Sequence, residues 1–307
     1  MGHIFGPVPS RRLGLSLGVD VVPLKTCTLS CIYCQVGETP EPTLVRKEYI
    51  PVEEIRREIR EKLEKGPAPD WVTFSGSGEP TLHSGIGRII RYIKSITDIP
   101  VCVITNGTLL WIPEVRADIL EADAVMPSLD TAVEETFHTI NRPHHDLKVE
   151  TIIDGLVTFR NQYRGKLWLE ILLVNTINDT PEELNALVRA VERIVPDSVQ
   201  LNTVVRPPAD RSAKPLTRER LEEIRDMFGA KTEIIIPPQT TSNVSESVSI
   251  DDVREYLKRR PGNIEDISSA LRVEKGKVED IIGKLNQAGE VRHNEFFGKQ
   301  FWELAQQ

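Results

Sequence analysis

The sequence predicts an α/β fold with a smaller second domain at its C-terminal end. Short β-rich runs alternate with longer helical runs from about Gly18 to Ile236, and the alternation stops near Pro237. Strands that alternate with helices join through right-handed crossovers into a parallel sheet. The chain has 307 residues, 39% of them hydrophobic, which is enough to bury a sizeable core. Either an open doubly wound sheet or a curved, barrel-like sheet satisfies this pattern.

Six β-rich runs define the expected strands, and apolar residues at helical spacing define the helices between them. The strands are Val19–Leu24, Trp71–Phe74, Val101–Thr105, Ala124–Ser128, Leu167–Val174 and Val199–Thr203. The helical sets are Val52, Ile55, Ile59 and Leu63; Ile86, Ile89, Ile90, Ile93 and Ile96; and Leu184, Leu187, Val188, Val191 and Val195. The residues that mark first helical turns are Pro51, Pro113 and Pro181, with Thr180 as an N-cap.

Three short helices and a hairpin are expected after residue 247. Residues 237–247 are polar and have no apolar period, which predicts a linker between a first domain of residues 1–236 and a second of residues 248–307. The helices are expected at Val253–Leu257, Ile264–Leu271 and Val278–Leu285. Aromatic residues on both sides of Gly298 predict a hairpin after them. Helix, helix–turn–helix and hairpin in this order predict a winged-helix-like domain.

Charge and hydropathy narrow the expected partners and the compartment. The 46 acidic residues against 38 basic ones give a net charge of −8, which argues against a general cationic nucleic-acid binder. The N-terminal residues contain no apolar core of signal-peptide length, and no apolar run approaches the length of a membrane span. We therefore expect a cytoplasmic protein that has no membrane partner and keeps its thiols reduced.

Three of the four cysteines lie within eight positions, directly after the first expected strand. Cys27, Cys31 and Cys34 can converge on one centre from a single loop, and thiolates select zinc or iron–sulfur clusters. Structural zinc requires four ligands, so zinc here would need a distant fourth ligand such as Cys102 or His83. A 4Fe–4S cluster normally has four cysteine ligands, so three would leave one iron open to an external ligand. Cys102 lies mid-strand, where core packing is its expected role.

The CxxxCxxC spacing, with Tyr33 before the last cysteine, resembles the cluster loop of the radical S-adenosylmethionine (SAM) superfamily. The resemblance implies a partial (β/α)6 TIM-like barrel with one 4Fe–4S cluster on the three cysteines. It also implies that the methionine moiety of SAM chelates the open iron. Reductive cleavage of SAM would then give a 5′-deoxyadenosyl radical that abstracts hydrogen from the substrate. A reductant such as flavodoxin or ferredoxin would supply the electron.

Further motifs of that superfamily recur in order over residues 15–205. Gly76, Gly78 and Glu79 resemble the Gly-Gly-Glu element that holds the amino group of SAM. Glycine permits a close backbone approach, and a carboxylate can accept hydrogen bonds from an ammonium group. Polar residues at the ends of later strands resemble the positions that contact the methionine carboxylate and the ribose. Together with Tyr33, the residues that complete the expected SAM site are Asn106, Ser128, Asp130 and Asn175.

Five basic side chains are candidates for substrate contact, and each could equally be a solvated loop charge. Arg142 could bind a carboxylate or a phosphate in the barrel mouth. His144 lies in a stretch that holds three of the six histidines, and it could carry protons. The other candidates are Arg11, Arg12 and Arg206.

The N-terminal stretch from Gly6 to the cysteines resembles a largely uncharacterised group of the superfamily, often placed beside the wyosine-forming tRNA enzymes. Those enzymes hold a second cluster on additional cysteines, and with only Cys102 left here a cysteine-ligated second cluster is excluded by count. Three functions remain open for residues 248–307: recruiting a macromolecule such as tRNA for modification, recruiting a peptide or protein, or binding DNA as an iron–sulfur sensor without turnover. Residues 247–307 carry ten Lys or Arg against eleven Asp or Glu, which weakens both nucleic-acid hypotheses. The SAM motifs further disfavour the sensor.

Overall fold

In a computed structural model that describes residues 2–235 and 248–305, one sheet organises the larger part of the chain. Its eight strands lie side by side in chain order, from β1 to β8. Strands β2 to β8 pair in parallel, and β1 pairs antiparallel with β2 at one edge. The strands are β1 (Ile4–Ser10), β2 (Gly14–Val19), β3 (Trp71–Phe74), β4 (Val101–Thr105), β5 (Ala124–Pro127), β6 (Lys166–Leu173), β7 (Ser198–Thr203) and β8 (Thr232–Ile234).

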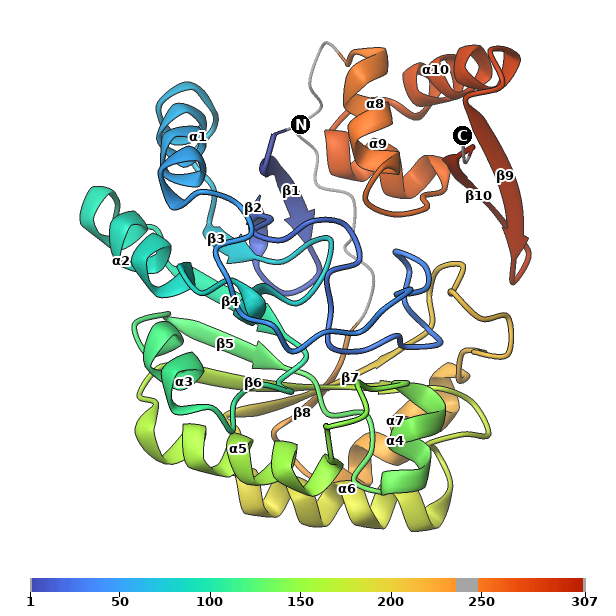
Figure 1. The fold of residues 1–307 in the computed structure, drawn as a ribbon. Coiled ribbons are helices and arrows are strands. Elements are labelled where there is room, and N and C mark those ends of the chain that lie inside the picture. The colour runs from blue at the N-terminus through green and yellow to red at the C-terminus, as the bar shows by residue number, and fades with distance from the viewer. Residues whose placement is uncertain (1, 236–247, 306–307) are drawn as a thin grey trace.

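Helices connect successive strands and cover the outer face of the sheet (Figure 1). They are α1 (Val52–Lys65), the 3-10 turn η1 (Pro80–Leu82), α2 (Ile86–Ile96), α3 (Pro113–Ile119), α4 (Glu134–Ile140), α5 (Val149–Gln162), α6 (Pro181–Ile194) and α7 (Arg218–Phe228). From β2 to α7 the chain forms six strand–helix units around a curved sheet, which confirms the partial (β/α)6 barrel. No helix of the described residues is both long and apolar enough to cross a membrane.

Most residues of the predicted helical stripes face this sheet, but the last predicted members of two stripes, Ile96 of α2 and Val195 after α6, are exposed because they lie where the helices end. Ile86, Ile89, Ile90 and Ile93 of α2 are all fully buried, as residues on one face of a core-facing helix should be. Thr180 caps α6 by accepting a hydrogen bond from the backbone of the third helical residue. Periodicity and capping therefore place these helices correctly.

The first parallel strand lies five residues earlier than predicted. Strand β2 occupies Gly14–Val19, so the predicted strand Val19–Leu24 is wrong except at its first residue. After Val19 the chain leaves the sheet, and Leu24 is exposed. Glycine and serine alternate with leucine and valine along β2, and this dilutes the β-rich composition by which the other strands are recognised.

Strand β1 escapes sequence-based prediction because it contains Pro7 and Pro9. Proline cannot donate a hydrogen bond to a ladder and is tolerated mainly at sheet edges. In this fold β1 lies at the edge, and its register against β2 shifts between Phe5 and Val8. The prolines therefore occupy a strand with one neighbour, where the missing donors are least costly.

The C-terminal part has its own apolar core, formed by three helices and a hairpin. The elements are α8 (Ile250–Leu257), α9 (Ile264–Leu271), α10 (Lys275–Gln287), β9 (Val291–Phe296) and β10 (Lys299–Leu304). This is the predicted order, and Phe297 and Gly298, both with positive φ, form the two-residue hairpin turn. The winged-helix identity itself stays a prediction. The predicted linker, residues 237–247, lies outside the described residues.

This C-terminal module, residues 248–305, contacts the barrel at two separate places. The guanidinium of Arg259 lies 4.6 Å from the centre of the Phe5 ring in β1. At the tip of the hairpin, Phe296 packs against an apolar cluster that includes Ile32 of the barrel. The module thus reaches from the edge strand to the segment that follows β2 (Figure 1).

Candidate active site

The three cysteines lie in the long connection between β2 and α1, in a segment that we call the cysteine loop (residues 25–37). Backbone hydrogen bonds tie this loop to the residues that end and follow α4. Ile32 N donates to Ile140 O at 2.9 Å, and His144 N donates to Thr28 O at 2.9 Å. Because these bonds are made by the backbone, they fix the course of the loop independently of its side chains.

The segment after β3 packs against the cysteine loop through two glycines. Glu79 N donates to Thr26 O at 2.9 Å. At Gly78 a Cβ would come within 1.9 Å of that same oxygen, so a side chain there would push the loop away. Gly76 has a φ of +143°, and a Cβ would lie 2.6 Å from Asp20 Oδ2. Gly78 is therefore needed for the cysteine loop to approach the segment after β3, and Gly76 for the close approach of Asp20, which follows β2.

One N–H donor reaches each of the three cysteine sulfurs. The donors come from the end of β4, the end of α4 and the loop itself. The pairs are Asn106 Nδ2 to Cys27 Sγ at 3.5 Å, Asn141 Nδ2 to Cys31 Sγ at 3.4 Å, and Lys25 Nζ to Cys34 Sγ at 3.4 Å. Hydrogen bonds to the ligand sulfurs are one of the means by which proteins stabilise and tune iron–sulfur clusters.

Burial favours the neutral thiols in this structure. Burial, together with the nearby Glu79 carboxylate, raises the pKa of Cys27 to about 12. Burial and then the Asp130 carboxylate raise the pKa of Cys31 as well. Thiolate is the form that binds metal, so a metal centre that binds here displaces these protons.

The sulfur positions do not match the spacing of a single zinc site. Zinc–sulfur bonds of about 2.3 Å place the sulfurs of one tetrahedral site about 3.8 Å apart. Within the described part of the chain, the three sulfurs do not all lie within 4.8 Å of one another. Both candidate fourth ligands are also engaged elsewhere: the His83 ring nitrogens bond to the backbone of Ile50 and Gly85, and Cys102 is fully buried in the core.

Glu79, the predicted partner of the SAM amino group, uses its carboxylate within the protein. Its side chain is buried, and burial raises its pKa. Oε1 accepts from Thr81 N at 3.0 Å, Thr81 Oγ1 at 2.6 Å and Thr105 Oγ1 at 2.6 Å, while Oε2 accepts from Asn106 N at 2.7 Å. The carboxylate therefore locks the ends of β3 and β4 together, and its contact with SAM stays a prediction.

Tyr33 and Asp130, both predicted cofactor contacts, bond to each other beside Cys31. The Tyr33 hydroxyl donates to Asp130 Oδ2, which also accepts from Asn141 Nδ2 at 2.8 Å. Asp130 Oδ1 accepts from Leu172 N at 3.0 Å. Burial and then the Asp130 charge raise the pKa of Tyr33, so the hydroxyl keeps its proton and remains the donor. This buried network ties the cysteine loop to β6.

Ser128 and Asn175, the remaining predicted SAM contacts at strand ends, lie in different environments. Ser128 extends β5 by a bridge to Glu170 of β6. Asn175 is exposed on the loop after β6. The buried asparagine of that loop is Asn178, whose Nδ2 donates to Asp130 O at 2.7 Å. Asn178 therefore supports the Tyr33–Asp130 network, and a contact between Asn175 and SAM stays a prediction.

Arg11 and Arg12 lie in the turn between β1 and β2 and reach across to β6 and β7. Arg12 Nη1 pairs with Glu170 Oε2 at 2.8 Å, and each side chain is only 12% exposed. Arg11 Nη1 donates to Asn202 Oδ1 at 3.2 Å. Burial lowers the pKa of Arg11 to about 10, assisted by the charges of Arg206 and Arg12 and opposed by Glu170. Glu170 is thus ion-paired with Arg12, while Arg11 bonds to the neutral side chain of Asn202.

Arg206 and Arg142 lie on either side of the cysteine loop. Arg206 Nη1 donates to Oε1 of Gln35, the residue after the last cysteine, at 3.2 Å, and Arg206 Nε pairs with Asp266 of α9 at 3.2 Å. Arg142 pairs with Asp210 at 2.6 Å near the surface. Arg206 is the less exposed of these two predicted substrate contacts, and it bonds to the cysteine loop through its side chain, whereas Arg142 does so through its backbone oxygen.

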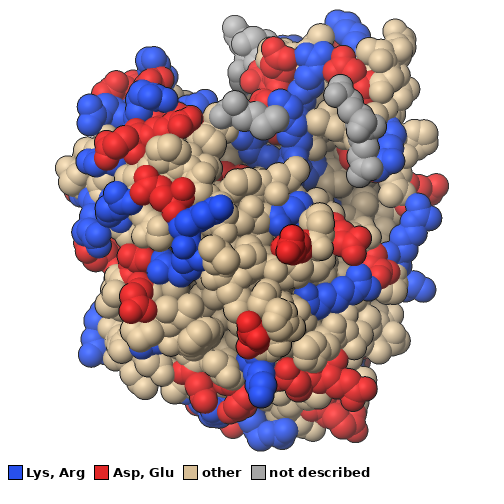
Figure 2. Space-filling view, in the orientation of Figure 1, with Lys and Arg blue, Asp and Glu red and all other residues tan. Residues whose placement is uncertain are grey.

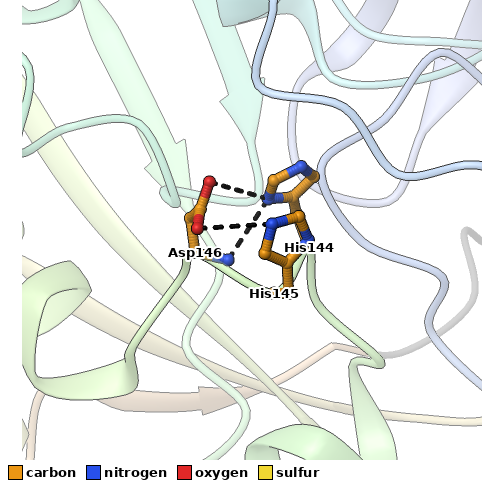
Figure 3. Close-up of side chains that lie close together, drawn as sticks. All are labelled: His144, His145 and Asp146. Carbon is orange, nitrogen blue, oxygen red and sulfur yellow. Dashed lines mark hydrogen bonds and ion pairs between the residues drawn. The ribbon is translucent and has the colours of Figure 1, made fainter.

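His144, His145 and Asp146 lie together just outside the cysteine loop (Figure 3). The two imidazole rings stack with centroids 4.2 Å apart, and His145 Nε2 lies 3.4 Å from Asp146 Oδ1. The side chains of His145 and Asp146 are 82% and 65% exposed, as expected for a solvated surface group. A substrate role for His144 stays a prediction, while its backbone N–H helps to fix the loop.

Four residues of this site lie outside the sequence-based predictions: Lys25, Asn141, Glu170 and Asn178. Lys25 stands two residues before Cys27, and a cation so close to a predicted ligand cysteine could have been recognised from the sequence. The other three follow or belong to elements that are distant in sequence from the cysteines. Only the fold brings them to the loop, so no local pattern could have identified them.

A partial barrel whose first parallel strand leads into three clustered cysteines defines a class of cluster-dependent enzymes. The sequence model of the Radical SAM superfamily matches residues 21–191, which is more than half of the chain. The chain therefore belongs to the radical SAM superfamily and is an enzyme of that class. Membership implies SAM and a 4Fe–4S cluster as cofactors and a reductant as partner.

Individual proteins are similar in sequence to this chain over most of its length. It is 34% identical over 306 residues to a UPF0026 protein of Methanocaldococcus jannaschii, covering 97% of this chain and 94% of that protein. It is 40% identical over 294 residues to GTPase Obg of Brachyspira hyodysenteriae, covering 94% of this chain but only 43% of that protein. Among solved structures, TYW1 with a lysine–pyruvate adduct bound has a similar fold, with a TM-score of 0.55 and 18% identity over 73% of this chain and 75% of that one.

Proposed function

We propose that Cys27, Cys31 and Cys34 hold one 4Fe–4S cluster, and that the enzyme cleaves SAM reductively and abstracts hydrogen from its substrate. When bound, the cluster supplies the electron for cleavage of the sulfonium, and the resulting 5′-deoxyadenosyl radical carries out the abstraction. The observation that supports this most directly is the N–H donor aimed at each cysteine sulfur. Three incidental buried thiols would not require such partners.

The donors differ in charge, and this gives each sulfur a different environment. Asn106 and Asn141 are neutral amides, and each also bonds to a second group near the loop, Thr28 at 2.7 Å and Asp130 at 2.8 Å. Lys25 is cationic and also donates to Gly37 O, which holds its ammonium beside Cys34. A fixed cation near one ligand stabilises negative charge on that side of the site.

The glycine segment and the buried carboxylates orient this ligand set. Gly78 lets the loop approach the end of β3, and the Glu79 carboxylate fixes Asn106 through its backbone N–H. Asp130 does the same for Asn141 through its side chain. The amides that face the sulfurs are therefore held by groups that are themselves buried, which keeps the site preorganised.

The test is SAM cleavage by the anaerobically reconstituted full chain. With dithionite and SAM, wild type should release 5′-deoxyadenosine and methionine. Cys31→Ala removes a ligand and should abolish the release together with the visible absorption of the cluster. The matched control is Cys102→Ala, which removes a buried thiol of β4 and should retain both properties.

Two outcomes would contradict the proposal. One is cleavage by Cys31→Ala at the wild-type rate, which would show that the three-cysteine site is not the reaction centre. The other is equal loss in Cys102→Ala, which would point to damage of the fold rather than of a ligand set. Chromatographic quantification of both products separates these cases.

A further inference from the structure

Four arginines lie within electrostatic range of one another where the barrel faces the C-terminal module. Arg11 and Arg12 come from the β1–β2 turn, Arg206 follows β7, and Arg260 follows α8. Arg12, Arg206 and Arg260 all lie close enough to Arg11 to help lower its pKa. We call these four residues the arginine group. Figure 2 shows Lys and Arg side chains gathered in the hollow beside the C-terminal helices.

The carboxylates that face this group do not balance it. Arg12 pairs with Glu170 at 2.8 Å, and Arg206 pairs with Asp266 at 3.2 Å. Four positive charges against these two negative ones leave a net charge of +2. Buried or half-buried charges in proteins are ordinarily paired, so an excess of this size points to an absent anionic partner.

Arg11 and Arg260 have no carboxylate partner among the described residues, and both keep unused N–H donors. Within the described residues, the Arg11 side chain makes one hydrogen bond, to neutral Asn202 Oδ1 at 3.2 Å. Arg260 lies 5.0 Å from the centre of the Tyr256 ring, with no ion pair to a described carboxylate. The junction therefore offers several N–H donors that the described protein atoms do not use.

We infer that the arginine group anchors a phosphate monoester group of a small substrate, an inference that rests on the proposed function. A phosphate dianion matches the excess charge, and planar guanidinium groups match its oxygens. Arg206 also bonds to Gln35, next to Cys34, so an anion held here lies beside the cysteine loop. A small phosphorylated substrate also agrees with ten basic against eleven acidic residues in 247–307, a balance that does not suit tRNA.

Isothermal titration of the full chain with inorganic phosphate, at constant ionic strength, tests this anchor. Arg11→Gln removes an unpaired charge and should weaken phosphate binding about tenfold. Asp266→Asn removes a competing carboxylate and should tighten binding severalfold. The control Arg218→Gln, at an α7 side chain that is 70% exposed, should bind as wild type does.

Thermal unfolding provides a second measurement. A ligand-binding role of Arg11 and a structural role of Arg11 predict opposite changes in Tm for the Arg11→Gln variant. If Arg11 serves the ligand, Arg11→Gln should raise the Tm in phosphate-free buffer, because it relieves repulsion among the remaining guanidinium groups. A fall in Tm would show that Arg11 holds the barrel together, and it would overturn its role as an anchor.

The remaining outcomes separate this inference from the proposed function. Absence of phosphate binding to wild type, or binding of acetate as tightly as phosphate, overturns the phosphate anchor. The titration contains neither SAM nor reductant, so a failure of SAM cleavage leaves a positive phosphate result standing. SAM cleavage without phosphate binding would overturn the anchor alone.

Discussion

Asn106 shows how single side chains build this site. Its Nδ2 donates to Cys27 Sγ and to Thr28 Oγ1, while its Oδ1 accepts from the backbone and hydroxyl of Thr108. Its own backbone N–H is held by Glu79. With every polar group engaged, the amide cannot flip without losing several hydrogen bonds, so its donor faces the sulfur in one defined orientation.

Arg12→Gln should lower the free energy of unfolding by about 2 kcal/mol near neutral pH, because it strips a buried carboxylate, Glu170, of its ion-pair partner. Burial alone would raise the pKa of Glu170, but the Arg12 charge outweighs it and holds the pKa below its ordinary value. This stabilisation is present above the ordinary carboxyl pKa and is lost as pH falls through the depressed pKa. Urea unfolding at descending pH should therefore show the wild type and the variant converging.

The control for this prediction is Arg225→Gln, which removes an exposed pair with Asp226 on α7. Exposed pairs contribute little, so its unfolding free energy should match wild type within about 0.5 kcal/mol. A pH-independent gap between wild type and Arg12→Gln would show that the loss comes from packing rather than from the ion pair.

At this scale, sequence identifies the residues whose role depends on local spacing. The three cysteines, Gly76 and Gly78 are readable because one loop or one turn contains the whole pattern. Asn141 is different, because it becomes a sulfur partner only when the end of α4 meets the cysteine loop. Asn178 escapes prediction for a related reason: the backbone of the loop after β6 decides that its side chain turns inward.

At the scale of elements, α6 is terminated by a residue, Val195, in a backbone conformation that valine tolerates poorly. Val195 follows the helix with φ 54° and ψ 58°, the left-handed conformation that commonly terminates helices. Glycine adopts it readily, whereas a β-branched residue is crowded there. The side chain is also 59% exposed, so it contributes little apolar burial in return.

Val195→Gly should therefore raise the free energy of unfolding by about 0.5–1 kcal/mol. Val195→Ala removes most of the side chain but keeps the unfavourable backbone conformation, so it should bring little or no gain. Chemical denaturation of the two variants beside wild type measures both effects. Equal stabilisation by alanine and glycine would assign the gain to the lost side chain instead of to the backbone.

Strands are predicted correctly where a β-rich composition coincides with a central position in the sheet. Trp71–Phe74 and Val101–Thr105 match β3 and β4 at both ends, because β-branched and aromatic residues fill strands that are buried on both faces. Strands β1 and β2 deviate because prolines, glycines and serines are tolerated near the sheet edge. The C-terminal helices are located correctly but begin up to three residues earlier than their apolar stripes, since helix starts are set by caps such as Ser249.

At the scale of the whole molecule, the Phe5 ring joins the two parts of the chain. On one side it receives the Arg259 guanidinium of the C-terminal module at 4.6 Å. On the other it covers Gly18 of β2, where a Cβ would lie 2.1 Å from a ring atom. The absence of a side chain at Gly18 is thus what lets the ring lie flat enough to meet the module.

Gly18→Ala should displace this ring, lower the free energy of unfolding by about 1–3 kcal/mol and loosen the module. Hydrogen exchange should become faster in α8 and α9 than in wild type. Phe5→Leu in the Gly18→Ala background makes room for the new methyl group, so the double variant should be more stable than the sum of the two single effects predicts. Strict additivity would show that the methyl group and the ring do not collide.

The contact between Phe296 and the cluster around Ile32 also bears on the order in which the protein is assembled. The ribosome makes the cysteine loop before it makes the hairpin that packs beside it. At roughly 5–20 residues per second, several seconds or more separate the completion of the barrel from that of the hairpin. During that interval the Phe296 contact is missing, so we expect the cysteine loop of the nascent chain to be more open to solvent on this side than it is in the finished fold.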